Sequence, residues 1–174
     1  MSQLLKDQPR IWLDEPKVEY AREFIAAMRD SRGFHQPWLT APSEPQAWRA
    51  YLDRLGRSNE AGFLVRLAGD NAICGVVNLN VITYEALCSA YLSYYVVKKH
   101  AQKGYMKEGL ERVIEHAFSE MGLHRLEANI QPDNERSIRL VESLGFECEG
   151  YSPRYLRIHG KWRDHERWAL LSDP

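Results

Sequence analysis

The chain has 174 residues, enough for one domain with a buried core, and 44% of them are hydrophobic while 27% are charged. Its 23 Lys and Arg residues nearly balance its 24 Asp and Glu residues, so no global basic field points to a nucleic-acid partner. No apolar run approaches the roughly 20 residues of a membrane span, and the N-terminal MSQLLKDQPR lacks the apolar stretch of a signal peptide. We therefore expect a cytoplasmic protein without a membrane partner.

Two helices are predicted before residue 60, and the segment between them carries aromatic side chains. Apolar residues recur at helical spacing over 18–28 and again over 45–55, where the second helix has a proline in its first turn. Residues 31–45 are rich in Pro, Gly and Ser and are predicted to form a loop. The loop aromatics Phe34 and Trp38 either close the edge of the core or wall a substrate pocket.

Strands dominate from residue 62 onward and alternate with helices in the second half; the sequence also allows a short strand around Ile11–Leu13. The pattern predicts two strands over 62–82 joined by a turn at Ala68–Asn71, a strand at 89–97, a helix ending near 121, a strand at 125–130, a helix between Asn134 and Gly145, and strands near 146–158 and 162–171. Because a helix connects 90–97 to 125–130, we expect these two strands to be parallel neighbours in a mixed sheet.

The chain shows no sequence pattern of disulfides or metal ligands. Cys74, Cys88 and Cys148 are scattered and lack CxxC spacing, which predicts reduced thiols buried as small apolar side chains. The run from Asp164 to Glu166 lies on a predicted strand, where successive side chains point to opposite faces and do not converge on one ion. No metal site is predicted.

The loop after the strand at 89–97 has the features of an anion site. It reads Gln102, Lys103, Gly104, Tyr105 and Met106, and it opens a helix whose first N–H groups have no partner within the helix. These groups and the positive end of the helix dipole favour phosphate, and a glycine allows close backbone approach. The alternative is an ordinary connection with solvated lysines. The loop matches neither GxGxxG nor GxxxxGK[ST], so dinucleotide and nucleoside triphosphate binding are disfavoured.

A second candidate unit follows the strand at 125–130. Asn134 and Ser137 are predicted in the first turn of the next helix, just beyond the C-terminal end of that strand. In open α/β sheets, ligands bind at this edge. The alternative is that Asn134 is a plain helix cap and that Ser137 lies on the helix surface.

Together the two units resemble the GNAT superfamily of N-acetyltransferases, and most closely its RimJ/RimL type. The segments that carry the resemblance are SYYVVKKHAQKGYMKEGL, LHRLEANIQPDNERSIRLVESLGFECEG and YLRIHGKWRDHERWALL. The family's acetyl-CoA loop reads Gln/Arg-x-x-Gly-x-Gly/Ala, and this chain has Ala101, Gly104 and Met106 at those places. The resemblance implies one N-acetyltransferase domain over 1–174. Its α/β fold would have a mostly antiparallel mixed sheet that splays between two parallel neighbouring strands and is flanked by about four helices.

The resemblance also implies how the donor is held. The strand over Tyr95, Val96 and Val97 would part from its parallel neighbour, and acetyl-CoA would lie in the gap. Its pyrophosphate would sit on the N–H groups from Gln102 to Met106, and Asn134 would contact its arm from the other side. A strand N–H near Val96 could serve as the donor to the oxyanion.

Catalytic groups are less clearly indicated. Many superfamily members use a tyrosine on the last helix to protonate the leaving thiolate, but the matching position here is Val141. In the RimL type the Ser of Asn-x-x-Ser protonates the thiolate instead, and the resemblance implies this role for Ser137. Glu127 is a candidate general base, and pairing with an arginine is its alternative use.

The implied reaction is direct transfer of an acetyl group from acetyl-CoA to a primary amine, without an acyl-enzyme. The resemblance favours a protein N-terminal α-amine. The alternatives are a polyamine, amino sugar or amino acid, or a regulatory domain that binds acyl-CoA without catalysis. Whether the chain forms a homodimer stays open. The aromatic candidates for the wall of the acceptor pocket are Trp38, Tyr84, Tyr94, Tyr151 and Tyr155.

Overall fold

The computed structural model describes residues 9–172. The expectation that the N-terminal segment is not a signal peptide concerns mainly residues 1–8, which lie outside this range. Its elements in chain order are β1 (Ile11–Asp14), η1 (Val18–Tyr20), α1 (Ala21–His35), α2 (Pro45–Leu55), β2 (Ala61–Leu67), β3 (Ile73–Thr83), β4 (Ser89–Val96), η2 (Lys98–His100), α3 (Tyr105–Ser119), β5 (Arg125–Ile130), α4 (Glu135–Glu142), β6 (Glu147–Ile158) and β7 (Lys161–Leu171). No helix of the described residues is long and apolar enough to cross a membrane.

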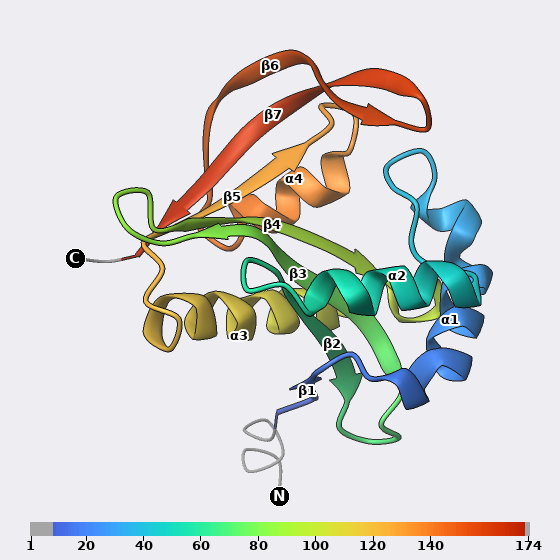
Figure 1. Ribbon diagram of the computed structural model, residues 1–174. Helices are drawn as coiled ribbons and strands as arrows, with labels where there is room; N and C mark the ends of the chain where they lie inside the picture. The colour runs from blue at the N-terminus through green and yellow to red at the C-terminus, as the bar shows by residue number, and fades with distance from the viewer. Residues whose placement is uncertain (1–8, 173–174) are drawn as a thin grey trace, which may run out of the picture.

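The strands form one seven-stranded sheet in the order β1-β2-β3-β4-β5-β7-β6 (Figure 1). Every neighbouring pair is antiparallel except β4 and β5, which are parallel as predicted. That parallel pair is short, because only Ser89–Tyr91 pairs with Arg125–Glu127. Both strands continue further, to Val96 and to Ile130, but beyond this point they do not pair with each other. The sheet therefore splays between β4 and β5, and the predicted fold class is confirmed.

Alternating side chains on the central strands build a core on each face of the sheet. Leu64 and Val76 pack with α1 and α2 on one face, whereas Val65 and Val77 pack with α3 and α4 on the other. All four side chains are fully buried. This is the period-2 pattern of strands that are covered on both sides. On β4 it sends Tyr95 toward α1 and α2, and Tyr94 and Val96 toward the opposite face.

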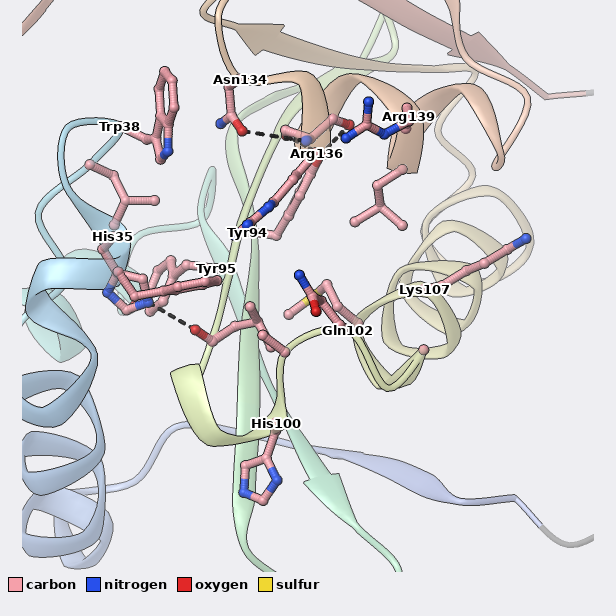
Figure 2. A pocket seen from close by; sticks show the side chains of 18 residues that line it. His35, Trp38, Tyr94, Tyr95, His100, Gln102, Lys107, Asn134, Arg136 and Arg139 are labelled. Carbon is pink, nitrogen blue, oxygen red and sulfur yellow. Dashed lines mark hydrogen bonds between the residues drawn. The ribbon is translucent and has the colours of Figure 1, made fainter.

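Helix α1 is longer than the sequence predicted. It runs to His35 and includes Gly33, so the expected loop over 31–45 shrinks to residues 36–44. The stop is Pro37, whose ring disfavours helical geometry in the residue before it. The extra turn matters because it places Phe34 and His35 on a helix, with His35 pointing toward β4 (Figure 2).

The three cysteines are free thiols, but they are not all buried. Cys74 on β3 lies in the core as expected, whereas Cys88 is partly exposed and Cys148 is exposed. The prediction of burial is wrong for Cys148 because β6 is the last strand of the sheet, and its residues before Gly150 face solvent.

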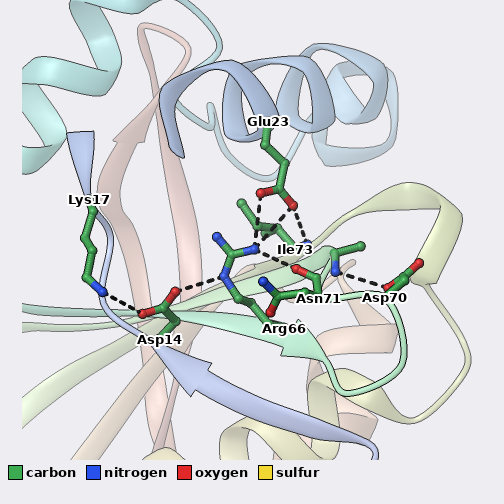
Figure 3. A network of polar contacts seen from close by, with 8 residues as sticks. Asp14, Lys17, Glu23, Arg66, Asp70, Asn71 and Ile73 are labelled. Carbon is green, nitrogen blue, oxygen red and sulfur yellow. Dashed lines mark hydrogen bonds and ion pairs between the residues drawn. The ribbon is translucent and has the colours of Figure 1, made fainter. Parts of the chain in front are cut away.

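A buried guanidinium ties β1, α1 and β2 together (Figure 3). Arg66 on β2 is 1% exposed and donates from Nε to Asp14 Oδ2 at 3.0 Å and from Nη1 to Glu23 Oε2 at 3.2 Å. Nη1 also donates to the carbonyl oxygen of Asn71 at 2.6 Å. Glu23 in turn accepts the Ile73 N–H at 2.9 Å. The first helix is thus anchored to the sheet by a polar cluster as well as by the apolar core.

This cluster predicts an acid-sensitive part of the stability. Burial alone would raise the pKa of Asp14, but hydrogen bonds from Tyr20 and Lys17 and the charges of Lys17 and Arg66 outweigh it, so the pKa lies below its usual value. A lowered folded-state pKa stabilises the fold above the unfolded-state pKa, and this stabilisation is lost as pH falls through the folded-state pKa. We expect wild type to exceed Asp14→Asn in urea midpoint by a constant amount above about pH 5. This difference should shrink toward pH 3. A difference that stays constant down to that pH would contradict the assignment.

Candidate active site

The end of β4 presents backbone groups to the gap between β4 and β5. The register places Val96 opposite Gly75, and the Val97 N–H donates to the Cys74 carbonyl oxygen at 2.9 Å. Because residues alternate along an antiparallel pair, the N–H and C=O of Val96 point away from β3 and into the gap. β5 pairs with β4 only as far as Tyr91, so no strand of residues 9–172 bonds the Val96 N–H on this side. This edge can therefore bind an extended ligand through its main chain.

Helix α1 holds this edge in place. His35 Nε2 lies 2.9 Å from the Val96 carbonyl oxygen, which fixes the proton on Nε2, and the Lys98 N–H donates to Ser31 Oγ at 3.0 Å. Burial lowers the pKa of His35, against the opposing effect of its bond to Val96, so the ring is neutral at pH 7. Sequence reasoning missed His35. The sequence spacing could have identified it, because His35 continues the helical spacing of Met28 and Ser31 on one face of the helix.

The loop before α3 has the geometry of an anion site. Gly104 caps the helix in the left-handed conformation, with φ of 83°, and Gln102 also has a positive φ of 62°. The first hydrogen bond of the helix runs from the Glu108 N–H to the Gly104 carbonyl oxygen at 3.2 Å, and no side chain of the described part of the chain caps the helix. Within the described residues, none of the N–H groups of 102–107 donates to another protein group. These donors and the helix dipole favour a phosphate.

Met106, which departs from the family's small residue, is accommodated by a glycine on the sheet. A Cβ on Gly75 would overlap the terminal methyl carbon of Met106, so the absence of a side chain at this position of β3 makes room for the methionine. Met106 is 8% exposed and packs into the core. The larger side chain therefore fills space behind the loop and leaves the loop backbone accessible.

A cavity of about 460 Å³, here called cavity I, lies between this loop, β4 and the start of α4 (Figure 2). Phe34 and Trp38 both line it, which agrees with the pocket-wall interpretation of these aromatics. The predicted site residues that line it are Tyr95, Val96, Gln102, Gly104, Met106, Asn134 and Ser137. Three other predicted donor-binding residues do not line cavity I. Val97 is buried in the core, with 2% of it exposed. The Lys103 carbonyl oxygen accepts a hydrogen bond from Arg10, and the Tyr105 ring has the Arg10 guanidinium 4.9 Å from its centroid.

A second cavity of about 520 Å³, here called cavity II, adjoins cavity I and shares Leu39, Tyr94 and Tyr95 with it. Its polar lining comes from α2, β3 and β4, and from Thr40 in the loop before α2. The Tyr51 hydroxyl donates to Asn78 Oδ1 at 2.7 Å, and Asn80 Nδ2 donates to Ser93 Oγ at 3.0 Å. Arg54 also lines it, held at 2.8 Å from Glu60 and at 2.6 Å from Asn80 Oδ1. None of the described residues that line either cavity is Asp or Glu.

The start of α4 brings two hydroxyl groups together. Asn134 caps the helix and accepts the Ser137 N–H at 3.4 Å, so the cap interpretation is confirmed, although Asn134 also lines cavity I. The Ser137 hydroxyl lies 2.6 Å from the Tyr94 hydroxyl. Burial raises the pKa of Tyr94 to about 12, and the bond to Ser137 acts in the opposite direction. Val141, at the position of the family's tyrosine, is wholly buried in the core.

Glu127 and several aromatic candidates lie outside the cavities. The Glu127 carboxylate accepts from Arg125 Nε at 2.8 Å, which is the alternative use considered for it, and it lines neither cavity. Of the aromatic candidates for the acceptor pocket, Trp38 lines cavity I and Tyr94 lines both cavities, whereas Tyr84 and Tyr151 are exposed elsewhere and Tyr155 lies on the β6–β7 hairpin. Within residues 9–172, no group of three His, Cys, Asp or Glu side chains is placed to hold a metal ion.

Comparison with known proteins agrees with this geometry. The sequence profile described as Acetyltransferase (GNAT) domain matches residues 10–147. The chain is 34% identical over 151 residues to the [ribosomal protein uS5]-alanine N-acetyltransferase of Escherichia coli (82% of this chain, 78% of the relative). It is 26% identical over 150 residues to the spermidine N(1)-acetyltransferase of Vibrio cholerae (85% and 86%).

A solved structure shares the fold. Mycobacterium smegmatis RimJ in complex with CoA-disulfide superposes with a TM-score of 0.85 at 25% identity, covering 93% of this chain and 82% of that one. Proteins of this family use acetyl-CoA, and the main-chain donors of β4 and of the loop before α3 suit such a donor. The sequence profile, the splayed sheet and this shared fold together establish that the chain belongs to the GNAT family of acetyltransferases.

Proposed function

We propose that the protein acetylates the N-terminal α-amine of a protein, with acetyl-CoA as donor and with direct attack of the amine on the thioester. The observation that carries this proposal is the lining of cavity II, which offers amide and hydroxyl groups and, among the described residues, no carboxylate. The long charged side chains that line cavity I are Lys107, Arg136 and Arg139, and all three are cations.

The charge of these linings separates two classes of acceptor. A polyamine is positive along its length. Burying it in cavity II would leave its charge uncompensated, because no described lining residue is a carboxylate and the nearby Glu60 already pairs with Arg54. A peptide N-terminus has one ammonium group, which must lose a proton before attack, followed by backbone amides. The side chains of Asn78 and Ser93 can hydrogen-bond such amides. The similarity to the ribosomal-protein enzyme supports the same class of acceptor.

The donor side of the proposal assigns the phosphates to the loop and the thioester to β4. The N–H groups from Gln102 to Met106 would bind the pyrophosphate, and Asn134 would contact the arm of CoA. The Val96 N–H would stabilise the oxyanion, since it faces the gap and no strand bonds it there. Binding both reactants in line supplies much of the rate of such a transfer, so direct attack needs few further groups.

A panel of amines tests this function. It contains peptides with free Ala, Ser or Met N-termini, the same peptides N-terminally blocked but with an internal lysine, spermidine and an amino sugar. We expect acetylation of the free peptides at the N-terminal nitrogen, located by fragment masses, and a kcat/KM for spermidine that is lower by about 100-fold. Preference for spermidine or the sugar would contradict the proposed acceptor. CoA binding without turnover of any amine would favour a regulatory domain.

The charge argument also predicts the effect of adding a carboxylate. Asn78→Asp keeps the acceptor for the Tyr51 hydroxyl and places a negative charge in cavity II. We expect the ratio of kcat/KM for spermidine to that for peptide to rise about 10-fold, which corresponds to ~1.4 kcal/mol of charge interaction. Asn80→Asp is the matched control, because its new charge would lie against Arg54, 2.6 Å from the present amide oxygen. An equal effect of the two variants, or none, would contradict the argument.

A further inference from the structure

Arg54 presents its positive charge to cavity II, while its counter-ion stays outside the lining. It lies in the last turn of α2 and lines the cavity, and its side chain is 34% exposed. Its partner Glu60 has a side chain that is 9% exposed, and this residue does not line the cavity. A group bound in cavity II therefore contacts the guanidinium and not the carboxylate, and it meets an excess of positive charge.

One edge of the Arg54 guanidinium is free to bind a ligand. Nη1 donates to Glu60 at 2.8 Å and to Asn80 Oδ1 at 2.6 Å, but Nε and Nη2 donate to no residue of the range 9–172. The Tyr51 ring lies beside the guanidinium, with 5.5 Å between its centroid and the guanidinium carbon, and helps to orient it. Nε and Nη2 form one side of the arginine fork, which can bind both oxygens of a carboxylate.

The rest of the polar lining offers hydrogen-bond donors more than acceptors. The Asn78 amide oxygen already accepts from Tyr51 at 2.7 Å, and the Asn80 amide oxygen accepts from Arg54. The Asn80 amide nitrogen is also occupied, since it donates to Ser93 Oγ. The donors left within the described chain are the Asn78 amide nitrogen, the Ser93 hydroxyl and the free edge of Arg54. Such a lining favours a ligand rich in acceptor oxygens, and a carboxylate above all.

We propose that cavity II selects protein N-termini with Asp or Glu as second or third residue, and that Arg54 binds this carboxylate. The inference rests on the proposed function, because it takes the acceptor to be a peptide that is acetylated at its α-amine. An extended peptide advances only about 3.3–3.6 Å per residue. Because cavity II adjoins cavity I, the side chains that directly follow the reacting amine would lie in cavity II. Arg54 is then a specificity-determining residue and takes no part in the chemistry.

A free amino acid also carries a carboxylate, but it fits this placement less well. Its carboxylate and its amine are separated by a single carbon atom, so both would lie next to the thioester. Arg54 lines cavity II and does not line cavity I, where the end of β4 faces the gap. A carboxylate that is one or two residues further along a peptide matches the position of Arg54.

Matched peptides test the preference for an acidic residue. Each begins with a free Ala and carries Asp, Asn or Lys at the second or the third residue, in an otherwise identical sequence. At one of these two positions, kcat/KM for the Asp peptide should exceed that for the Asn peptide about 10-fold, because the charged hydrogen bonds are partly screened by solvent. The Lys peptide should be the poorest substrate. Added salt should narrow the difference between Asp and Asn peptides.

Charge-neutral variants assign the preference to Arg54. Arg54→Gln alone would leave the buried Glu60 carboxylate without its partner, so Glu60→Gln is combined with it. In this double variant, kcat/KM for the Asp and Asn peptides should agree within about twofold. Glu60→Gln alone should keep the preference for Asp, since the cation remains. Arg49→Gln is the matched control, because Arg49 is exposed on the same helix and lines neither cavity.

Binding of the reaction products gives a readout that needs no turnover. With CoA present, the N-acetylated Asp peptide should bind wild type with a Kd about 10-fold lower than that of the N-acetylated Asn peptide. In the double variant the two Kd values should be equal, whereas Arg49→Gln should keep the difference. This measurement tests the carboxylate site by itself, separately from the rate of acetyl transfer.

The possible failures can be told apart. Equal kcat/KM and equal product affinity for Asp and Asn peptides in wild type would overturn the inference and leave N-terminal acetylation standing. A preference for Asp that survives in the double variant would also overturn it, because the carboxylate would then bind elsewhere. Acetylation of free glutamate or spermidine, and of none of the peptides, would contradict the proposed function and with it this occupant of cavity II.

Discussion

Replacing Gly104 by valine should weaken CoA binding by about 100-fold. Gly104 begins α3 with φ of 83°, a conformation that costs a β-branched residue about 1–2 kcal/mol. The loop would leave this conformation, and its N–H groups would no longer converge on the pyrophosphate. The loss of two charge-assisted hydrogen bonds at about 1.5 kcal/mol each gives ~3 kcal/mol, or about two decades in Kd. Calorimetric titration with CoA measures the effect directly.

A second glycine provides the control for strain. Gly122, beyond the other end of α3, also has a positive φ, of 65°, and a side chain there would meet nothing within 4 Å. Gly122→Val should lower the urea midpoint by an amount similar to Gly104→Val and leave the Kd for CoA unchanged. At Gly104 the nearest atom to an added Cβ is the end of the flexible Arg10 side chain, so the expected loss comes from the backbone and not from a clash. Equal CoA affinity of wild type and Gly104→Val would mean that the loop does not bind the donor.

The features that sequence predicted well are those that depend on residues close together in the chain. The glycine turn before α3 and the cap at Asn134 are local, and the parallel order of β4 and β5 follows from the helix between them. The partner of Glu127 is local too, because Arg125 lies two residues away on the same face of β5.

The parts of the site that sequence did not predict depend on contacts between distant segments. His35 meets Val96 across 61 residues, and Tyr94 meets Ser137 across 43 residues. Neither pair has a spacing that a helix or strand period would reveal. His35 was also hidden by its neighbours, since Gly33 and Pro37 gave its segment the composition of a loop, although the helical spacing continued through it. The lining of cavity II, which includes Arg54, likewise comes from separate segments, namely α2, the loop before it, β3 and β4.

Removing the buried guanidinium of Arg66 should lower the free energy of unfolding more than any other substitution proposed here. The Arg66 side chain is 2% exposed, and it compensates Asp14, 8% exposed, and part of the charge of Glu23 (Figure 3). Its guanidinium also lies over the Tyr20 ring, 4.2 Å from the centroid. Arg66→Met keeps much of the apolar stem but leaves the buried Asp14 carboxylate with only the half-exposed Lys17 as its cation, and breaking a buried pair in this way costs about 3–5 kcal/mol. Domains of this kind have only about 5–15 kcal/mol in total, so the variant should be close to unfolding.

Urea unfolding with a surface pair as control tests this expectation. Arg139→Met breaks an ion pair with Glu135 whose side chains are 65% and 74% exposed, and it should change the free energy of unfolding by no more than about 0.5 kcal/mol. Adding Asp14→Asn to Arg66→Met should restore part of the loss, because the buried charge that lacks a partner is then gone. If Arg66→Met costs no more than Arg139→Met, apolar packing alone anchors the first helix. A double variant that is still less stable than Arg66→Met would also contradict the argument. The buried Asp14 carboxylate would then not be what destabilises Arg66→Met.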